Sequence, residues 1–278
     1  MRDRRMGLLW KAMGVFLFFT LTQNAATLIA ALAAAKKLSI AGGLFAAMES
    51  DAVMAQVNAW SPLILLIADG AVIMTLLLWG ALKEHRPPLD YAALRNPIGP
   101  AVGVLCVLAG AAANFWFALA INLLPWPQGW ITEYAGNASV LSGTDPVTLL
   151  AVILFAPACE ELVFRGRIYG YLSEIIPAGA AVILQAVLFG GLHAGKVWML
   201  YAFCVGCVLG YVRKLTGSLR GSLYMHISFN ATANLFDLFA RRLGDHTTAV
   251  MAALLISAGL FLACVYEIGR HSRKEGIR

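Results

Sequence analysis

Three apolar segments in the second half of the chain carry polar side chains whose types and spacing could support hydrolysis. In the first segment, Glu160 and Glu161 end an apolar run, and Arg165 follows Glu161 at position i+4. Residues four apart share a helix face, so Arg165 can pair with Glu161, whereas Glu160 is rotated by about 100° and escapes that pairing. Two adjacent carboxylates at low dielectric resist double ionisation. This pattern favours Glu160 as a general base and Glu161 as a braced neighbour.

Two later apolar segments each carry a histidine with a partner at i±4. Phe189 precedes His193 by four residues, and His226 precedes Asn230 by four. A stripe of imidazole, amide and acid cannot face lipid, because nothing there satisfies its hydrogen bonds. We therefore expect the third segment to face a wet interior or another helix. The residues that continue its polar side are Ala233, Asn234 and Asp237.

Together these residue types supply what amide hydrolysis by water requires. Glu160 is the candidate base, one imidazole is its partner, and the other imidazole with Asn230 could stabilise a tetrahedral oxyanion. Glu160, His193 and His226 are also plausible zinc ligands, and spacing alone does not decide between the two chemistries. Each cluster could instead be structural, as a headgroup-facing ion pair or an interhelical seam. Asp69, an acid in an earlier apolar segment, has no evident partner and could serve structure or transport.

The elements that position these residues must be membrane helices. Hydrophobic residues make up 60% of the 278 residues and charged residues 13%, against about 45–50% and about 25% in soluble domains. A span needs about 20 mainly apolar residues. The sequence predicts an all-α polytopic bundle of about eight transmembrane helices, forming a single membrane domain over residues 1–278. The predicted segments are residues 7–35, 60–82, 98–124, 146–166, 177–195, 197–215, 219–240 and 247–269.

The basic residues orient this bundle. With the N-terminus inside, 16 of the 21 Lys and Arg, among them Arg165 and Arg167, fall on the side of the two termini. The positive-inside rule then predicts that both termini are cytoplasmic. The apolar N-terminal stretch exceeds the 7–15 residues of a signal peptide, so we expect an uncleaved first helix. The scattered net charge of +6 fits loops beside anionic lipid, and we expect the bilayer, and no nucleic acid, as partner.

The ordered motifs resemble those of the CPBP intramembrane proteases (CAAX proteases and bacteriocin-processing enzymes), which include the type II CAAX prenyl endopeptidases. Glu160, Glu161 and Arg165 match the Glu-Glu-x-x-x-Arg motif of that family. Phe189 with His193, and His226 with Asn230, match its Phe-x-x-x-His and His-x-x-x-Asn/Asp motifs. The resemblance covers a catalytic core at residues 145–240 and leaves residues 1–130 as accessory transmembrane helices.

The resemblance implies an endopeptidase whose conical cavity opens toward the cytoplasm and the membrane. It implies that Glu160 and His193 activate water, that His226 and Asn230 form the oxyanion site, and that Glu161 and Arg165 brace it, with Phe189 in support. It favours a glutamate mechanism without cofactor or metal; a metal-dependent variant would place zinc at Glu160, His193 and His226. A bacterial-type inner membrane is the implied location.

The substrate implied is a peptide or protein at the membrane, with prenylation and the oligomeric state left open. Two other functions fit the same residues. A proton-coupled transporter could use the acids and His193 as a relay, and a catalytically silent scaffold or immunity protein could bind a partner through its bundle. The relay residues would be Asp69, Glu160, Glu161, His193 and Asp237.

Overall fold

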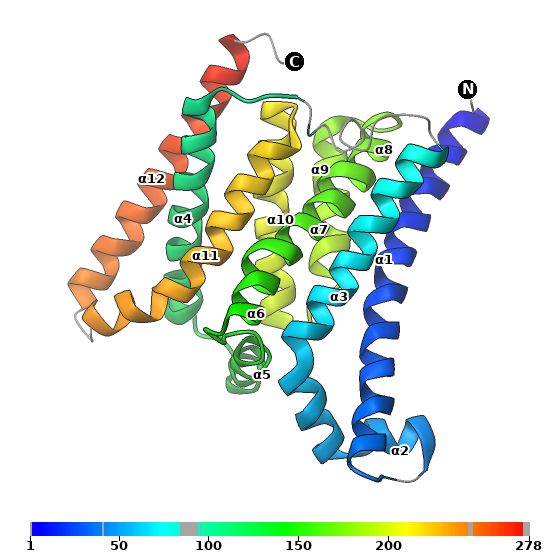
Figure 1. Ribbon diagram of the computed structural model, residues 1–278. Coiled ribbons are helices and arrows are strands. Elements are labelled where there is room, and N and C mark those ends of the chain that lie inside the picture. The colour runs from blue at the N-terminus through cyan, green and yellow to red at the C-terminus, as the bar shows by residue number, and fades with distance from the viewer. Residues whose placement is uncertain (1, 41, 84–93, 95, 244–246, 275–278) are drawn as a thin grey trace.

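The computed structural model describes residues 2–40, 42–83, 94, 96–243 and 247–274, and these residues form helices and connecting turns without a β-strand (Figure 1). The side chains of residues 2, 83, 234, 235, 237–243 and 274 lie outside this description. The helices are α1 (Arg2–Lys37), α2 (Gly43–Glu49), α3 (Asp51–Lys83), α4 (Pro100–Leu123), α5 (Gln128–Ser139), α6 (Pro146–Leu149), η1 (Leu150–Phe155), α7 (Ala156–Glu160), η2 (Glu161–Ile168), α8 (Tyr169–Ser173), α9 (Ala178–Gly190), α10 (Lys196–Thr216), α11 (Leu219–Leu243) and α12 (Thr247–Lys274).

All eight predicted segments are helical, and the all-α polytopic membrane class is confirmed. Successive long helices run in alternating directions, so both termini lie at the same end of the bundle (Figure 1). Among the described residues, six helices are long and apolar enough to span a membrane. The other two predicted spans do not meet that criterion. α9 has 13 residues, about 20 Å of helix at 1.5 Å per residue, and α11 carries the polar stripe that lowers its hydropathy.

The fourth predicted segment is longer than expected and is not a regular α-helix. Residues 146–173 form one continuous rod in which two π-helical stretches, η1 and η2, flank the short α7. Pro157 in α7 has no N–H to donate, and wider helical turns accommodate such a gap. π-Helical turns are frequent at functional sites. Here they place Glu160 and Glu161 at a junction between two helix types.

Asp145 starts this rod. Its carboxylate accepts hydrogen bonds from the Thr148 hydroxyl at 2.5 Å and from the backbone N–H groups of Val147 and Thr148 at 3.1 Å. These bonds, the Thr148 hydroxyl first, hold the pKa of Asp145 below its usual range. The cap satisfies N–H groups that a helix start leaves unpaired.

The bundle is held by close helix pairs. α4 packs against α11 and α12, α9 packs against α10, and α1 packs against α3. α4 and α11 approach so closely at Gly110 that a Cβ there would lie 2.1 Å from the Met225 carbonyl oxygen. A glycine is therefore required at this crossing. It fixes the helix that carries His226 and Asn230.

Arg165 and Arg167 correct the sequence interpretation. They were counted with the basic residues of the terminal end, but both side chains are buried, with 0% and 3% of the residue exposed. Arg167 donates to the Leu76 carbonyl at 3.0 Å and to the Tyr171 hydroxyl at 3.2 Å. They therefore do not reach the headgroups. Without them the excess of Lys and Arg at that end persists, 14 against 5.

Candidate active site

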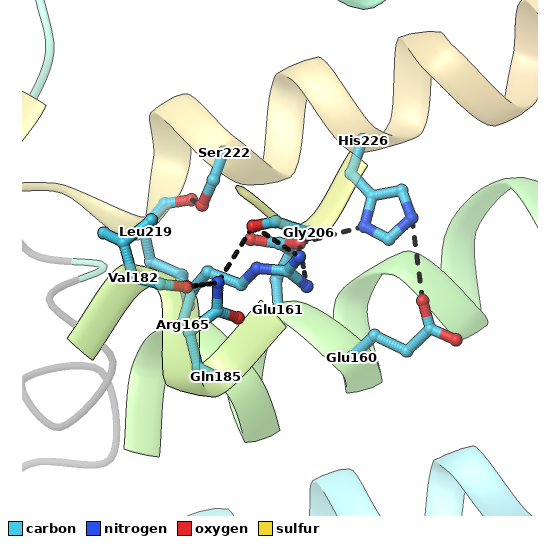
Figure 2. A network of polar contacts seen from close by, with 9 residues as sticks. All are labelled: Glu160, Glu161, Arg165, Val182, Gln185, Gly206, Leu219, Ser222 and His226. Carbon is cyan, nitrogen blue, oxygen red and sulfur yellow. Dashed lines mark hydrogen bonds and ion pairs between the residues drawn. The ribbon is translucent and has the colours of Figure 1, made fainter. Parts of the chain in front are cut away.

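The three motifs converge in the middle of the bundle. Glu160 and Glu161 lie at the α7–η2 junction, Phe189 at the end of α9, His193 in the turn after it, and His226 on α11. Figure 2 shows Glu161 and Arg165 on one side of the His226 ring and Glu160 on the other. Five of the seven residues identified from the sequence line one cavity, while Glu161 and Arg165 are buried behind it. The five are Glu160, Phe189, His193, His226 and Asn230.

The two adjacent glutamates have different environments. Glu161 Oε1 forms an ion pair with Arg165 Nη1 at 3.1 Å and accepts a hydrogen bond from His226 Nδ1 at 2.9 Å, and the side chains of Glu161 and Arg165 have no exposed area. Glu160 Oε2 lies 3.6 Å from His226 Nε2, and 21% of its side chain is exposed. Glu161 is thus committed to the guanidinium and the imidazole (Figure 2), whereas Glu160 lines the cavity.

The partners of His226 and His193 define their tautomers. Both Nδ1 atoms face acceptors, Glu161 Oε1 for His226 and the Phe189 carbonyl for His193, each at 2.9 Å. A backbone carbonyl and a carboxylate paired with Arg165 can only accept, so Nδ1 carries the proton in both rings. Nε2 is then the nitrogen through which each ring exchanges protons. The Nε2 of His226 is the one found beside Glu160.

Phe189 joins the buried ion pair to the cavity. The Arg165 guanidinium lies 4.4 Å from the centroid of the Phe189 ring, a distance suited to a cation–π contact. The same ring packs edge-on against His193, with centroids 4.8 Å apart, and against Phe164 at 5.1 Å. Phe189 therefore fixes the position of His193 relative to Arg165.

Gln185 and Gly206 complete this network, and sequence reasoning missed both as site residues. The Gly206 carbonyl accepts from Arg165 Nη2 at 3.3 Å and from Gln185 Nε2 at 2.9 Å. Gln185 also donates to the Val182 carbonyl at 2.8 Å (Figure 2). A single amide in an otherwise apolar helix, four residues before Phe189, was the available sign of Gln185. Gly206 carries no such sign, because its backbone carbonyl makes the contact.

Two cavities meet at the catalytic candidates. The larger has a volume of about 700 Å³ and the smaller, on the α1 side, about 170 Å³. Glu160, Phe189, Leu192 and His193 line both. Cavities of this size have room for water and for a short peptide segment.

The remaining polar residues divide in two groups. Asn230 lines the larger cavity and donates to the Val152 carbonyl at 2.9 Å, but the side chains of Asn234 and Asp237 lie outside the described residues. Asp69, which the sequence left without a partner, accepts from Gln23 of α1 at 2.7 Å and contacts Cys159. It lies next to the site through Cys159, the residue before Glu160.

The zinc alternative does not fit the geometry. Among the residues that the structure describes, no group of three His, Cys, Asp or Glu side chains is arranged to hold a metal ion. Glu160, His193 and His226 share the cavity wall, but they do not form such a group; the partners of the two Nδ1 atoms leave each Nε2 free and so do not decide the question. We therefore derive no chemical step through a metal.

Comparisons with known proteins agree with the motifs. Residues 142–232 match the family model described as type II CAAX prenyl endopeptidase Rce1-like. A curated protein of Bacillus subtilis (strain 168), named "Putative membrane peptidase YdiL", is 26% identical over 176 residues, which is 61% of this chain and 71% of that protein. No solved structure matches the chain significantly. The resemblance is confirmed: the segment that builds this site is similar in sequence to the Rce1-like type II CAAX prenyl endopeptidases.

Proposed function

We propose that this protein is an intramembrane endopeptidase that hydrolyses a peptide bond of a membrane-associated polypeptide with water activated by Glu160. One observation carries the proposal. Of two adjacent carboxylates, Glu161 is bound by Arg165 and His226, while Glu160 lines a cavity of about 700 Å³ with an imidazole nitrogen 3.6 Å away. The Rce1-like match and the peptidase named above support a protease.

In the first step, a water molecule beside Glu160 attacks the carbonyl carbon of the scissile bond. The Glu160 carboxylate accepts one proton from that water, and the electron pair of the carbonyl bond moves to the oxygen. A positioned carboxylate base contributes about 100- to 10,000-fold to such a rate.

The developing oxyanion needs hydrogen-bond donors. We assign this role to Nε2–H of His226 in its protonated form and to the Asn230 amide, because both residues line the cavity. The Glu161 contact holds the His226 ring from behind, so Nε2 is directed to the Glu160 side. Preorganised donors of this kind stabilise the charge as it forms.

In the second step, the carbon–nitrogen bond breaks. The proton held by Glu160 passes to the leaving amide nitrogen, directly or through Nε2 of His193, which shares both cavities with Glu160. The products are a carboxylic acid and an amine, and the Glu160 carboxylate is restored.

The decisive variant is Glu160→Gln, which keeps the shape of the side chain and removes the base. Terminal proteomics of membranes from cells with the wild-type protein or the variant should show cleavage products that are lost in the variant. Glu174→Gln is the matched control, because Glu174 is an exposed acid at the end of the same rod. Full cleavage by Glu160→Gln would refute the mechanism, and an unchanged set of termini with an unchanged phenotype would favour the silent scaffold.

A further inference from the structure

α1 carries a polar stripe in the middle of a mainly apolar stretch, and the mechanism above does not use it. Thr20, Gln23, Asn24 and Thr27 are spaced at i, i+3, i+4 and i+7, so they share one face of the helix. α1 lies at the edge of the bundle, where it packs against α3 and against the rod that carries Glu160 (Figure 1). A polar face at this place needs partners, because lipid offers its oxygen atoms no hydrogen bonds.

The smaller cavity lies against this stripe. Thr20, Gln23 and Asn24 line it, together with Glu160 and His193. Its other described lining residues are apolar, namely Phe19, Phe164, Phe189 and Leu192. No described residue of α1 lines the larger cavity, whose wall comes mainly from α4, α5, α10 and α11. The two cavities therefore reach Glu160 from different helices.

Hydrogen bonds within α1 occupy donors of the stripe and leave its oxygen atoms as acceptors. The Thr20 hydroxyl donates to the Phe16 carbonyl at 2.9 Å, and the Asn24 amide donates to the Thr20 carbonyl at 2.8 Å. A hydroxyl that donates to the backbone keeps its lone pairs, and so does the oxygen of an amide. With the Glu160 carboxylate, the wall of the smaller cavity is thus rich in acceptors, and it suits a small ligand that donates hydrogen bonds.

Asp69 holds Gln23 in one orientation. Gln23 Nε2 donates to Asp69 Oδ1 at 2.7 Å, and Asp69 lies on the neighbouring α3 with 1% of the residue exposed. The oxygen and the nitrogen of an amide are bonded to the same carbon and diverge from it, so Gln23 Oε1 is directed away from Asp69. The buried acid therefore determines which atom of Gln23 is left to bind a ligand in the smaller cavity.

We propose that the smaller cavity is a water site, which supplies the hydrolytic water to Glu160 while the polypeptide occupies the larger cavity, and that Gln23 positions this water. The inference rests on the proposed function for the reaction that consumes the water. A volume of about 170 Å³ has room for several water molecules, because each takes about 30 Å³ in the liquid. A water that donates one hydrogen to Glu160 and the other to Gln23 Oε1 keeps its lone pairs for the carbonyl carbon.

A separate water site matters because a polypeptide bound in the larger cavity displaces the water there. Each turnover consumes one water molecule, and Glu160 must receive the next one while the reacting bond is in place. Asn24 is exposed, and Thr20 and Gln23 are half-buried, so the smaller cavity is accessible along α1. The acceptors of the stripe then retain water beside Glu160.

Hydration of the smaller cavity is tested without any assay of cleavage. Thr20→Cys places a thiol in its wall, and Thr22→Cys places one two residues along α1, at a position that lines neither cavity. Methanethiosulfonate ethylammonium reacts with thiolates, which form in water far more readily than in apolar surroundings. The purified protein is held in lipid nanodiscs, which expose both membrane faces, and the unsubstituted protein with its five cysteines gives the background.

We expect Thr20→Cys to react on the order of tenfold faster than Thr22→Cys, because its thiol meets water. Equal rates for the two variants would overturn the proposal. So would a Thr20→Cys thiol that reacts in the denatured protein and not in the native one.

The use of this water in the reaction is tested by removing one hydroxyl at a time. Thr20→Val and Thr22→Val make the same change, and both hydroxyls donate to the carbonyl four residues earlier, at 2.9 and 2.8 Å. With a peptide identified by the terminal proteomics, we expect Thr20→Val to lower kcat about 2- to 10-fold, as for one lost hydrogen bond, with KM unchanged. Gln23→Leu should lower kcat further at a temperature where this variant is folded.

Two results would contradict the water site. A higher KM with unchanged kcat in Thr20→Val would show that the smaller cavity holds part of the substrate. Equal kcat values for Thr20→Val and Thr22→Val would show that the stripe takes no part in the reaction. Absence of cleavage by the wild type would refute the proposed function, and the thiol rates would still decide by themselves whether the cavity is hydrated.

Discussion

Glu161 and Arg165 form a fully buried ion pair, and its main effect is to position the side chains that contact it. The pair fixes His226 Nδ1 at 2.9 Å, and the guanidinium also contacts the Phe189 ring and the Gly206 carbonyl. One charge therefore connects α11, α9 and α10 to the rod that carries Glu160. Removing it should affect folding and the site together.

Arg165→Leu leaves the Glu161 carboxylate buried without its guanidinium, so we expect a loss of about 3–5 kcal/mol in the free energy of unfolding. Denaturant unfolding in detergent measures this. The double variant Glu161→Gln with Arg165→Leu should recover part of the loss, because no bare charge remains. Arg4→Leu, which breaks the exposed Arg4–Glu174 pair, is the control, with an expected effect of roughly 0–1 kcal/mol. A loss as large for Arg4 would contradict this account.

Metal dependence is a second question at the scale of residues. Because no group of three His, Cys, Asp or Glu side chains among the described residues is arranged to hold a metal ion, we expect activity of the purified protein to persist in EDTA and in phenanthroline. The measurement is peptide cleavage before and after chelation. Inactivation that is restored by added zinc would show that a metal takes part.

At the scale of elements, the position of α11 decides whether the site exists. This helix supplies His226 and Asn230, and it crosses α4 at Gly110, where backbone meets backbone. The rod of residues 146–173 provides Glu160 at a junction of helix types. Small changes in either element move the imidazole relative to the carboxylate.

Gly110→Ala tests the crossing. A Cβ at this position would lie 2.1 Å from the Met225 carbonyl oxygen, so α11 must move away from α4. We expect a loss of stability of about 1–3 kcal/mol, as for overpacked cores, and a fall in cleavage rate beyond what lower protein yield explains. Gly103→Ala on the same helix is the control, since the nearest atom that its Cβ would meet is in the Tyr224 ring, at an ordinary contact distance of 3.7 Å. Equal melting temperatures for the two variants would contradict the close crossing.

The contact between α1 and α3 gives another prediction at this scale. Gln23→Leu removes the hydrogen bond to Asp69, which is 1% exposed, and leaves a buried carboxyl without that partner. We expect a loss of about 1–3 kcal/mol in stability. Thermal unfolding in detergent measures it, and Asn24→Leu on the exposed side of the same helix should change little. If Gln23→Leu were as stable as the wild type, the pair would have no structural role.

At the scale of the whole molecule, the membrane topology decides toward which face of the membrane the cavity lies. Both termini lie at one end of the bundle, and α5, which lines part of the cavity, lies at the other (Figure 1). The alternating directions of the eight helices decide how deep in the membrane the catalytic candidates lie. Two of these helices are too short or too polar to meet the criterion for a membrane span. Of those two, α11 carries His226 and Asn230, and His193 lies in the turn that follows α9.

Reporter fusions test this topology. We expect a fluorescent protein to fold and emit at the C-terminus, and alkaline phosphatase to be active when inserted between α1 and α2, because the excess of Lys and Arg on the side of the termini predicts that this side is cytoplasmic. Phosphatase activity at the C-terminus would reverse the orientation.

The sequence by itself determined that the protein lies in a lipid bilayer, where its eight helices are and which seven residues form the motifs. It did so because apolar run length, helical spacing at i+4 and the cost of a charge in lipid are local properties. The tertiary structure decided which nitrogen faces which oxygen. It paired His226, and not His193, with Glu160, added Gln185 and the Gly206 carbonyl, gave Asp69 its partner and buried two arginines that local reasoning placed at the surface. These outcomes depend on how helices distant in sequence cross, and the spacing along one helix carries no information about that.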